Sequence, residues 1–380
     1  MRVDVLVVGA GPAGGSLSFL LARAGLNVLM IDSKRFIGKK SCSGILGYKC
    51  LEELPVNVDP FVVSEIKTGI FESPGGVKIR FEGRIAKVVD RVPLDREIID
   101  VALSNGAKIR TGCRFVGIEN EKAIILGENG YEKISFKYLV GADGVYSKVR
   151  DVLGWKIEAP YLGIQVFSNK RISPEEGFIA KIKRGSRFLW IYPWGDRSRV
   201  GVLGKRIDPL MEWIREIVPS FTGKEVAAIP SMPLKSFHKG NVALVGDAAG
   251  QVKPLSRGGV YLGVKGAKLL ASSIIDSYER DLPVIEDSYE RMWWRLFGFE
   301  IKAGLAFRKV LDRMNPRELD SIFSSLRDYE AKISSFDIDH QLSSALMNVG
   351  FLERLKIVLS RPKFFIRLLH ALISCYLTYL

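Results

Sequence analysis

Three glycines near the N-terminus have the spacing that a phosphate-binding turn requires. Gly9, Gly11 and Gly14 directly follow the apolar run 3–8, and small and apolar residues recur at helical spacing over 17–24. Glycines here permit a tight turn and a close approach of the backbone to a ligand, while the N-terminus of the next helix faces a pyrophosphate. The motif, with its strand and helix, predicts a dinucleotide-binding unit.

An acidic residue completes this unit. Asp32 ends the next apolar run, 28–31, which closes a strand–helix–strand unit of the usual size. A carboxylate at this point accepts a hydrogen bond from a ribose hydroxyl of adenosine and disfavours a 2′-phosphate, so FAD or NAD is expected and NADP is not. The residues expected to contact the nucleotide here are Gly9, Gly11, Pro12, Ala13, Gly14, Asp32 and Ser33.

Composition limits the possible partners. The chain has 380 residues, 47% of them hydrophobic, and a formal net charge of +14, which favours an anionic partner such as nucleic acid, an acidic membrane surface or a phosphorylated substrate. Its basic residues are spread along the chain without a nucleic-acid-binding motif, so nucleic acid is not expected. The four cysteines have no metal-ligand spacing, and the chain opens on an apolar strand. We therefore expect reduced thiols, no metal, no secretion signal and a cytoplasmic location.

The order of patterns predicts an α/β chain, α+β overall, in which a Rossmann-type domain is combined with an antiparallel-sheet domain and a helical C-terminal region. Alternating apolar positions predict a hairpin around 74–76 and an antiparallel sheet over about 160–235, and helical spacing predicts a helix over 91–105. The expected boundaries are 1–58, 86–158 and 236–284 for the nucleotide-binding domain, 59–85 and 159–235 for the sheet domain, and 285–380 for the helical region.

Three further motifs resemble those of the large flavoprotein family that includes the aromatic hydroxylases. They are Asp90-Arg91-x-x-Leu94-Asp95, Gly141-Ala142-Asp143-Gly144 and Gly246-Asp247-Ala248-Ala249-Gly250, in the order that this family uses. The resemblance spans most of residues 1–270 and implies that the cofactor is FAD. It also implies that Arg91 lies near the phosphates and ribityl chain and that Asp143 and Gly144 lie near the flavin and pyrophosphate. Asp247 would bind the ribityl chain, and Gly246 would also lie at the cofactor.

A narrower resemblance is to the FAD-dependent geranylgeranyl reductases. Its signature is Phe188-Leu189-Trp190-Ile191-Tyr192-Pro193, followed by Gly195-Asp196 and Val200-Gly201-Val202. The segments Lys40-Ser41-Cys42-Ser43-Gly44-Ile45-Leu46 and Pro254-x-x-x-Gly258-Gly259-Val260 are also similar to this family, although Ser43, Ile45 and Arg257 stand where it has glycines. The resemblance implies that Cys42, Pro254, Gly258, Gly259 and Val260 lie at the FAD.

The same resemblance implies a reaction. The chain would saturate carbon–carbon double bonds of polyprenyl (geranylgeranyl) chains on membrane ether phospholipids or their precursors. Electrons would come from an external donor such as NADH or ferredoxin, between which the sequence does not choose.

Four residues are candidates for catalysis, namely Cys42, Trp190, Tyr192 and Arg257. Because alternate residues of a strand face one side, Phe188, Trp190 and Tyr192 are expected to form an apolar wall for the substrate, with Pro193 beside it. Alternatively, these aromatic residues fill a core. Arg257 stands beside a helix N-terminus, where it would stabilise negative charge on the flavin or bind a substrate phosphate, or else be a solvated loop arginine. Cys42 either contacts the substrate or is an inert thiol.

The C-terminal segment 364–380 is almost wholly apolar, with Arg367 as its one firm charge, and it follows Arg354, Lys356, Arg361 and Lys363. Its 17 residues only just reach the shortest membrane span. We expect either an interfacial helix on an anionic membrane, peripheral to its inner face, or a helix docked on the protein's own core.

Other functions stay open. An FAD-dependent monooxygenase or halogenase shares the general fold, and halogenases carry a Trp-x-Trp-x-Ile-Pro stretch similar to 188–193. A quinone-linked electron-transfer flavoprotein dehydrogenase has a similar flavin domain, but its larger members carry a cysteine-rich module that this sequence lacks. A flavoprotein that binds or senses without turnover is the third alternative.

Overall fold

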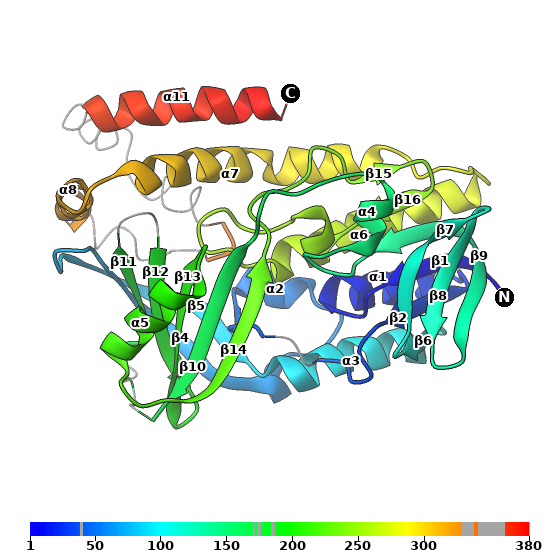
Figure 1. Ribbon diagram of the computed structural model, residues 1–380, viewed down its shortest axis with the longest axis horizontal. Coiled ribbons are helices and arrows are strands. Elements are labelled where there is room, and N and C mark those ends of the chain that lie inside the picture. The colour runs from blue at the N-terminus through cyan, green and yellow to red at the C-terminus, as the bar shows by residue number, and fades with distance from the viewer. Residues whose placement is uncertain are drawn as a thin grey trace.

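The computed structural model describes residues 1–38, 41–169, 172, 176–183, 187–327, 338–340 and 362–379. Within these ranges the strands form two sheets, which lie on opposite sides of Figure 1. The two sheets meet near the glycine turns of the first, so the fold brings segments that are far apart in sequence to one place.

The first sheet is a parallel sheet at its centre. Its strand order is β15-β16-β9-β1-β2-β6, and the neighbours from β16 to β6 are parallel. Strands buried on both faces are near-continuously apolar, which explains the runs at 3–8 and 28–31. β7 and β8 extend this sheet beside β9. Its strands are β1 (Arg2–Val8), β2 (Val28–Asp32), β6 (Lys108–Thr111), β7 (Arg114–Glu119), β8 (Lys122–Gly127), β9 (Gly130–Gly141), β15 (His238–Lys239) and β16 (Val242–Leu244).

Helices pack around the first sheet. α1 (Pro12–Arg23) contacts α3 (Arg91–Ser104) and α6 (Val260–Glu279). α3 begins after Asp90, whose side chain accepts a hydrogen bond from the backbone N–H of Val92 and so caps the helix. The expected helix over 91–105 is therefore confirmed. Shorter elements connect these parts: α2 (Tyr48–Glu53), α4 (Lys148–Val152) and the 3₁₀ turns η1 (Asp59–Phe61) and η2 (Gly246–Ala249).

The second sheet has the order β14-β10-β13-β12-β11-β4-β5-β3. Its hairpin β4–β5 turns at 74–76, as the sequence predicts, and β3 pairs with β5 although it lies within the segment 1–58. All neighbours are antiparallel, as expected for this sheet, except β4 and β11, which are parallel. Its strands are β3 (Ile45–Leu46), β4 (Val62–Glu72), β5 (Lys78–Val89), β10 (Tyr161–Ser168), β11 (Phe178–Lys183), β12 (Arg187–Trp194), β13 (Arg197–Gly204) and β14 (Thr222–Ile229).

A helix that the sequence analysis did not predict lies within the sheet segment 160–235. α5 (Ile207–Ile217) joins β13 to β14 and buries Leu210, Met211, Trp213 and Ile214 against the second sheet. These residues recur at helical spacing, so one face of the helix is apolar. The flanking segments have alternating apolar positions typical of strands, and the helical spacing of this short segment was therefore not recognised.

The C-terminal region is mainly helical where it is described, as expected, and 338–340 form a bend. α7 (Ser288–Arg313) runs along the molecule, α8 (Pro316–Arg327) follows it, and α11 (Pro362–Thr378) lies outermost against α7 (Figure 1). No helix in the described ranges is both long enough and apolar enough to cross a bilayer.

Candidate functional site

The three N-terminal glycines have different structural roles in the turn. Gly9 has φ +105°, and a Cβ there would lie 2.3 Å from the carbonyl oxygen of Ala142 at the end of β9. A Cβ on Gly14 would lie 2.0 Å from the carbonyl oxygen of Gly9, so this glycine lets α1 pack closely on the strand. A Cβ on Gly11 would meet none of the described atoms within 4 Å and would project into open space. These positions fit a turn that approaches a dinucleotide.

A cavity of about 890 Å³ opens beside this turn; we call it the Asp32 cavity. The Asp32 carboxylate lines it and accepts hydrogen bonds from the backbone N–H of Ala10 (2.9 Å) and of Lys34 (2.8 Å). Each oxygen keeps further acceptor capacity, which suits a ribose hydroxyl. Of the residues expected to bind the cofactor, Gly9, Gly11, Asp32, Ser33, Asp143, Gly144 and Asp247 line this cavity.

Asp143 lines the Asp32 cavity and has a buried carboxylate oxygen. Its Oδ2 accepts hydrogen bonds from the backbone N–H of Lys148 (2.7 Å) and Val149 (3.3 Å), whereas Oδ1 is buried without a hydrogen-bond partner in the described chain. Burial raises the pKa of this carboxyl above its usual range. The Arg150 guanidinium holds the two glycine turns together, because it donates to the carbonyls of Val145 and Ala248.

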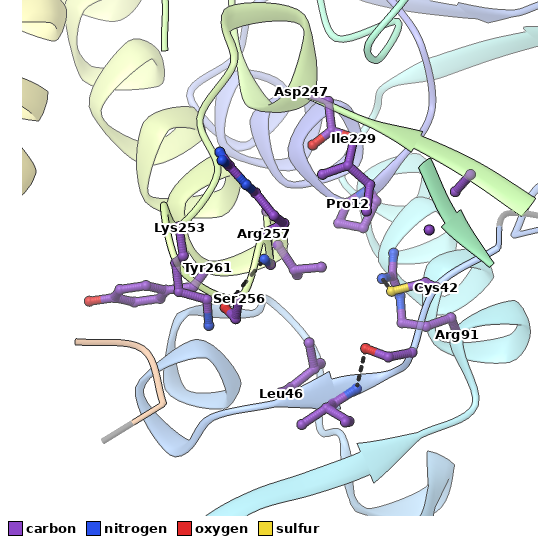
Figure 2. A pocket seen from close by; sticks show the side chains of 18 of the residues that line it. Pro12, Cys42, Leu46, Arg91, Ile229, Asp247, Lys253, Ser256, Arg257 and Tyr261 are labelled. Carbon is purple, nitrogen blue, oxygen red and sulfur yellow. Dashed lines mark hydrogen bonds between the residues drawn. The ribbon is translucent and has the colours of Figure 1, made fainter. Parts of the chain in front are cut away.

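A second cavity, of about 230 Å³, adjoins the first; we call it the Trp190 cavity. The two share Gly11, Gly144 and Asp247 in their walls. Figure 2 shows Cys42 and Arg91 together on one side and Lys253, Ser256 and Tyr261 on the other. The predicted residues in its wall are Gly11, Pro12, Ala13, Cys42, Arg91, Gly144, Phe188, Trp190, Gly246, Asp247, Arg257, Gly258, Gly259 and Val260.

The turn at Asp247 is packed against the start of α6. A Cβ on Gly259 would lie 2.7 Å from Oδ1 of Asp247, and one on Gly263 would lie 3.1 Å from the Cα of Gly246. Glycines at these two positions therefore allow the N-terminus of α6 to pack closely against the Gly246-Asp247 turn. Partial positive charge at a helix N-terminus favours a nearby anion or electron-rich group.

Arg91 ties the helix α3 to the Cys42 loop. Its guanidinium pairs with both oxygens of Asp95, at 2.8 and 3.0 Å, and its NH1 donates to the Cys42 Sγ at 3.0 Å. Both Arg91 and Asp95 are buried. Desolvation by itself would lower the pKa of Arg91, but the pairing with Asp95 outweighs it and raises that pKa. The sulfur of Cys42 thus accepts a charge-assisted hydrogen bond at the cavity wall.

Several residues of the second sheet hold the same loop from the other side. The carbonyl oxygen of Cys42 accepts from the Gln165 Nε2 (2.9 Å) and the Arg199 NH1 (3.1 Å). The Tyr192 hydroxyl donates to the carbonyl oxygen of Ser43 at 2.7 Å. The loop bearing Cys42 is therefore anchored by two sheet residues at one carbonyl and a third at the next.

The expected aromatic wall is only partly formed. Phe188 and Trp190 line the Trp190 cavity with ring centroids 5.4 Å apart, but Tyr192 is 0% exposed and lies in a core with Ile66, Phe81 and Val88. The placement of Tyr192 in the wall was wrong, because the Cys42 loop covers the sheet where Tyr192 emerges. Pro193 also lies outside the cavity wall.

Trp190 lies against a glycine of the neighbouring strand. Trp190 and Gly201 are register partners in β12 and β13, and a Cβ on Gly201 would lie 2.2 Å from the indole Cε2. The indole Nε1 is buried without a hydrogen-bond partner in the described residues. Gly201, a residue of the Val200-Gly201-Val202 motif, thus makes the space in which the indole ring lies flat on the sheet.

Arg257 is buried, so its interpretation as a solvated loop arginine was wrong. Only 5% of the residue is exposed, its φ is +63°, and its NH1 donates to the carbonyl oxygen of Ser231. A positive φ favours glycine, which accounts for the glycine that the similar family has here. In Figure 2 its side chain extends away from Cys42 and Arg91.

Two other predicted cofactor residues lie outside both cavities. Gly14 packs on the strand, as described above, and Pro254 is buried against α7, where a Cβ on Gly304 would approach its ring to 2.9 Å. Both residues are used in packing, and their contact with the cofactor stays a prediction. Lys40, Arg354, Lys356 and Arg361 lie outside the described residues.

The structure adds cavity residues that the sequence analysis did not select. The Lys253 Nζ pairs with the Oδ1 of Asp339 at 3.2 Å, and the Asp339 Oδ2 accepts from the backbone N–H of Cys50 at 2.9 Å. Lys253, Cys50 and Asp339 all line the Trp190 cavity. Lys253 directly precedes Pro254 and could have been noticed from that motif, whereas Asp339 is remote in sequence and gave no signal.

This fold and site define a flavoprotein oxidoreductase, with a parallel sheet that carries a dinucleotide turn and an apolar cavity beside that turn. The FAD binding domain family matches residues 2–292, so the chain belongs to this family and FAD is its cofactor.

Relatives of known name cover most of the chain. Digeranylgeranylglycerophospholipid reductases of Methanosarcina acetivorans and Methanococcus aeolicus are 27% and 29% identical, over 86% and 85% of this chain and 88% and 90% of their own lengths. An uncharacterized protein of Methanocaldococcus jannaschii is 31% identical over 90% of this chain and 93% of its own.

Solved structures show the same fold. A geranylgeranyl bacteriochlorophyll reductase-like protein from Thermoplasma acidophilum has a TM-score of 0.84 at 18% identity, and the match covers 96% of this chain and 99% of that one. A myxobacterial chondrochloren halogenase has a TM-score of 0.68 at 20% identity and covers 83% of each chain. At such identities the likeness concerns the fold alone.

Proposed function

We propose that this protein is an FAD-dependent reductase that saturates carbon–carbon double bonds of polyprenyl (geranylgeranyl) chains on ether phospholipids or their precursors. The observation that carries the proposal is the Trp190 cavity, in which Phe188 and Trp190 stand beside the residues that fit the cofactor. The names of the relatives from Methanosarcina and Methanococcus support the substrate class.

The cofactor would be held by residues of both cavities. Gly11 and the start of α1 fit the pyrophosphate, Asp32 fits the adenosine ribose, and Asp247 beside the start of α6 fits the ribityl chain. When bound and reduced, FAD supplies a hydride. The side chains of this protein must therefore position the alkene, exclude water and handle the proton.

An isolated trisubstituted alkene has no group that withdraws electrons, so proton transfer to one carbon must run ahead of hydride transfer to the other. Positive charge then develops on the chain and must be shielded from water. The indole of Trp190 offers a ring face at the cavity, and a ring face near a cation contributes about 0.5–2 kcal/mol. Trp190 is thus the residue of the signature best suited to stabilise this charge.

Cys42 is better suited to shape the site than to protonate the alkene. Its sulfur accepts a hydrogen bond from Arg91, and its carbonyl is held by Gln165 and Arg199. A thiol is also a weak acid for protonating an alkene. We therefore assign the Cys42 loop a positioning role along the polyprenyl chain.

We also propose that the enzyme meets its lipid at an anionic membrane surface. α11 packs on α7 through one face, with Cys375 buried, while Ile366, Leu369, Ile373 and Leu377 on its other face are 52–65% exposed. An apolar stripe on an outer helix, together with the net charge of +14, suits an interfacial helix. Sedimentation with anionic and with neutral vesicles tests this: Ile373→Ser with Leu377→Ser should abolish binding, and equal binding by the variant would refute it.

The reaction is tested with dithionite-reduced enzyme, a geranylgeranyl ether lipid and mass spectrometry under anaerobic conditions. The wild type should yield saturated products. Trp190→Ala should lose most of this activity but keep stoichiometric FAD, Trp190→Phe should keep a substantial part, and Cys42→Ser should stay active with a changed number of reduced bonds. Full activity in Trp190→Ala, or complete loss in flavin-loaded Cys42→Ser, contradicts these assignments.

The alternative function is that of a monooxygenase or halogenase. It is favoured only by likeness of fold, for example to the chondrochloren halogenase. The same preparation separates the two functions. A reductase leaves dioxygen unused in its productive cycle and works without it, whereas a monooxygenase or halogenase needs dioxygen for every product formed.

A further inference from the structure

Three cationic side chains converge on one tyrosine ring outside the contacts described so far. The Lys205 Nζ lies 4.1 Å, the Arg257 Cζ 4.5 Å and the Arg308 Cζ 5.5 Å from the ring centroid of Tyr161. They come from separate elements: Tyr161 starts β10, Lys205 follows β13, Arg257 precedes α6, and Arg308 belongs to α7. The fold thus assembles positive charge from four places.

Two of these cations are buried. Arg257 and Arg308 are each 5% exposed, whereas Lys205 reaches solvent. Among the described residues, the carboxylates near the cluster are Asp312, whose Oδ1 lies 3.8 Å from the Nε of Arg308, and Glu158, which acts on Lys205. Asp312 is only partly buried and Glu158 is exposed, so solvent weakens the attraction of these two carboxylates for the cluster.

Burial of like charges close together disfavours the charged forms of Arg257 and Lys205. Burial, with a further contribution from Arg308, lowers the pKa of Arg257 to about 10, and burial together with Arg257 lowers the pKa of Lys205. The Nε of Arg257 is buried without a hydrogen-bond partner among the described residues. Such a donor is costly unless a ligand accepts from it.

The cluster adjoins the Trp190 cavity. Arg257 lines that cavity, and Tyr161 is the register partner of Ile229, which also lines it. The Arg257 side chain extends away from Cys42 and Arg91 (Figure 2). Its Cζ lies 4.5 Å from the ring centroid of Tyr161. A ligand whose apolar part lies in the cavity could therefore place a polar end at the cluster.

Cation–π attraction alone does not account for this arrangement. One cation over the ring would gain that attraction, but three cations around one ring repel one another. The backbone of Arg257 is also held at φ +63°, an unfavourable conformation for a residue other than glycine. An anion with several oxygen acceptors would neutralise the charges and accept from Arg257 and Lys205.

We infer that Lys205, Arg257 and Arg308 bind a phosphoryl group, that of the polar end of the lipid whose polyprenyl chain occupies the Trp190 cavity. The identity of the lipid rests on the proposed function, whereas the phosphoryl chemistry rests on the cluster itself. A free pyrophosphate or the pyrophosphate of a nucleotide shares this chemistry, so the experiment separates these sources from the lipid.

The first arm measures binding without turnover. Calorimetric titration of inorganic pyrophosphate into the FAD-loaded protein should show binding that Lys205→Gln weakens about tenfold, the loss expected for one charge-assisted hydrogen bond. Lys205 is exposed, so the variant should fold. Lys224→Gln is the matched control, because Lys224 is an exposed lysine of β14 outside the cluster and should leave the affinity unchanged.

The second arm measures KM for two lipids with the same polyprenyl chains, one with a phosphate at the polar end and one with a free hydroxyl. Lys205→Gln should raise KM about tenfold for the phosphate-bearing lipid only. If pyrophosphate binding weakens but neither lipid is reduced by the wild type, the proposed function fails and the phosphoryl site stands. If both lipids are reduced and Lys205→Gln leaves their KM ratio unchanged, the assignment of the site to the lipid is overturned. Pyrophosphate affinity equal to the wild type overturns the site itself.

Discussion

The Tyr192 hydroxyl donates a 2.7 Å hydrogen bond to the carbonyl oxygen of Ser43, across 149 residues of sequence. This bond joins the signature strand β12 to the loop that carries Cys42. A motif residue expected to touch the substrate is instead a buried brace for another motif. The aromatic signature therefore acts in two ways, through Trp190 at the cavity and through Tyr192 behind the loop.

Tyr192→Phe should loosen the Cys42 loop without expelling FAD. Removing the donor leaves the Ser43 carbonyl without this partner, which costs about 1–2 kcal/mol in the free energy of unfolding, as urea denaturation can measure. Cys42 is half-buried while the other three cysteines are buried, so labelling by a thiol reagent reports on this loop. Labelling should become several-fold faster. Tyr131→Phe, at a 72% exposed site, is the control, and equal labelling rates in both variants would refute the brace.

Gly11→Ala should separate cofactor binding from folding. The added methyl group would meet none of the described protein atoms within 4 Å, but it would enter the space shared by the two cavities. The apoprotein should unfold within about 0.5 kcal/mol of the wild type, whereas flavin absorbance after purification should be largely lost. Gly117→Ala, equally free of neighbours but on β7, should keep its flavin. Wild-type flavin content in Gly11→Ala would exclude the close approach.

Gly201→Ala should displace the indole of Trp190. A methyl group 2.2 Å from the ring forces it off the sheet, at a cost of about 1–3 kcal/mol in stability. Because Trp190 lines the cavity, tryptophan fluorescence should change and KM for the polyprenyl lipid should rise, while FAD stays bound. Gly117→Ala again serves as the control. Unchanged fluorescence and kinetics would show that the ring is held in some other way.

The ion pairs of His238 with two acidic residues should make the free energy of unfolding depend on pH. His238 in β15 lies 3.6 Å from Glu290 and 3.0 Å from Asp287. Interaction with Glu290 raises the pKa of His238, and Asp287 adds to this effect. Burial acts in the opposite direction but does not outweigh them. Burial alone would raise the pKa of Glu290, but hydrogen bonds from His238, Phe237 and Ser236 lower it overall.

The signs of these two shifts define a window. The stabilisation from His238 is complete below the ordinary histidine pKa and is lost as pH rises through its raised value; that from Glu290 is lost as pH falls through its lowered value. Urea denaturation should therefore show His238→Gln to be less stable than the wild type near pH 6 by on the order of 1 kcal/mol, with the difference shrinking toward about pH 9. A difference that grows with pH would contradict the pairing.

Local sequence patterns determined the cofactor unit. The turn at Gly9, Gly11 and Gly14, the carboxylate of Asp32 and the flanking strand and helix lie within one continuous segment, so their spacing alone predicts their arrangement. The family to which the chain belongs confirms FAD. The proposed roles of individual residues, and the domain boundaries at 58, 85, 158, 235 and 284, stay predictions.

The tertiary structure decided which side chains meet. Alternation in β12 places Phe188, Trp190 and Tyr192 on one face, but it does not reveal that the Cys42 loop covers the last of them. The pairing of Lys253 with Asp339, and the convergence of Lys205 and Arg308 on Tyr161, join positions 44 to 147 residues apart. Periodicity gives the face on which a residue lies, whereas what covers that face depends on packing between remote segments, which no local pattern encodes.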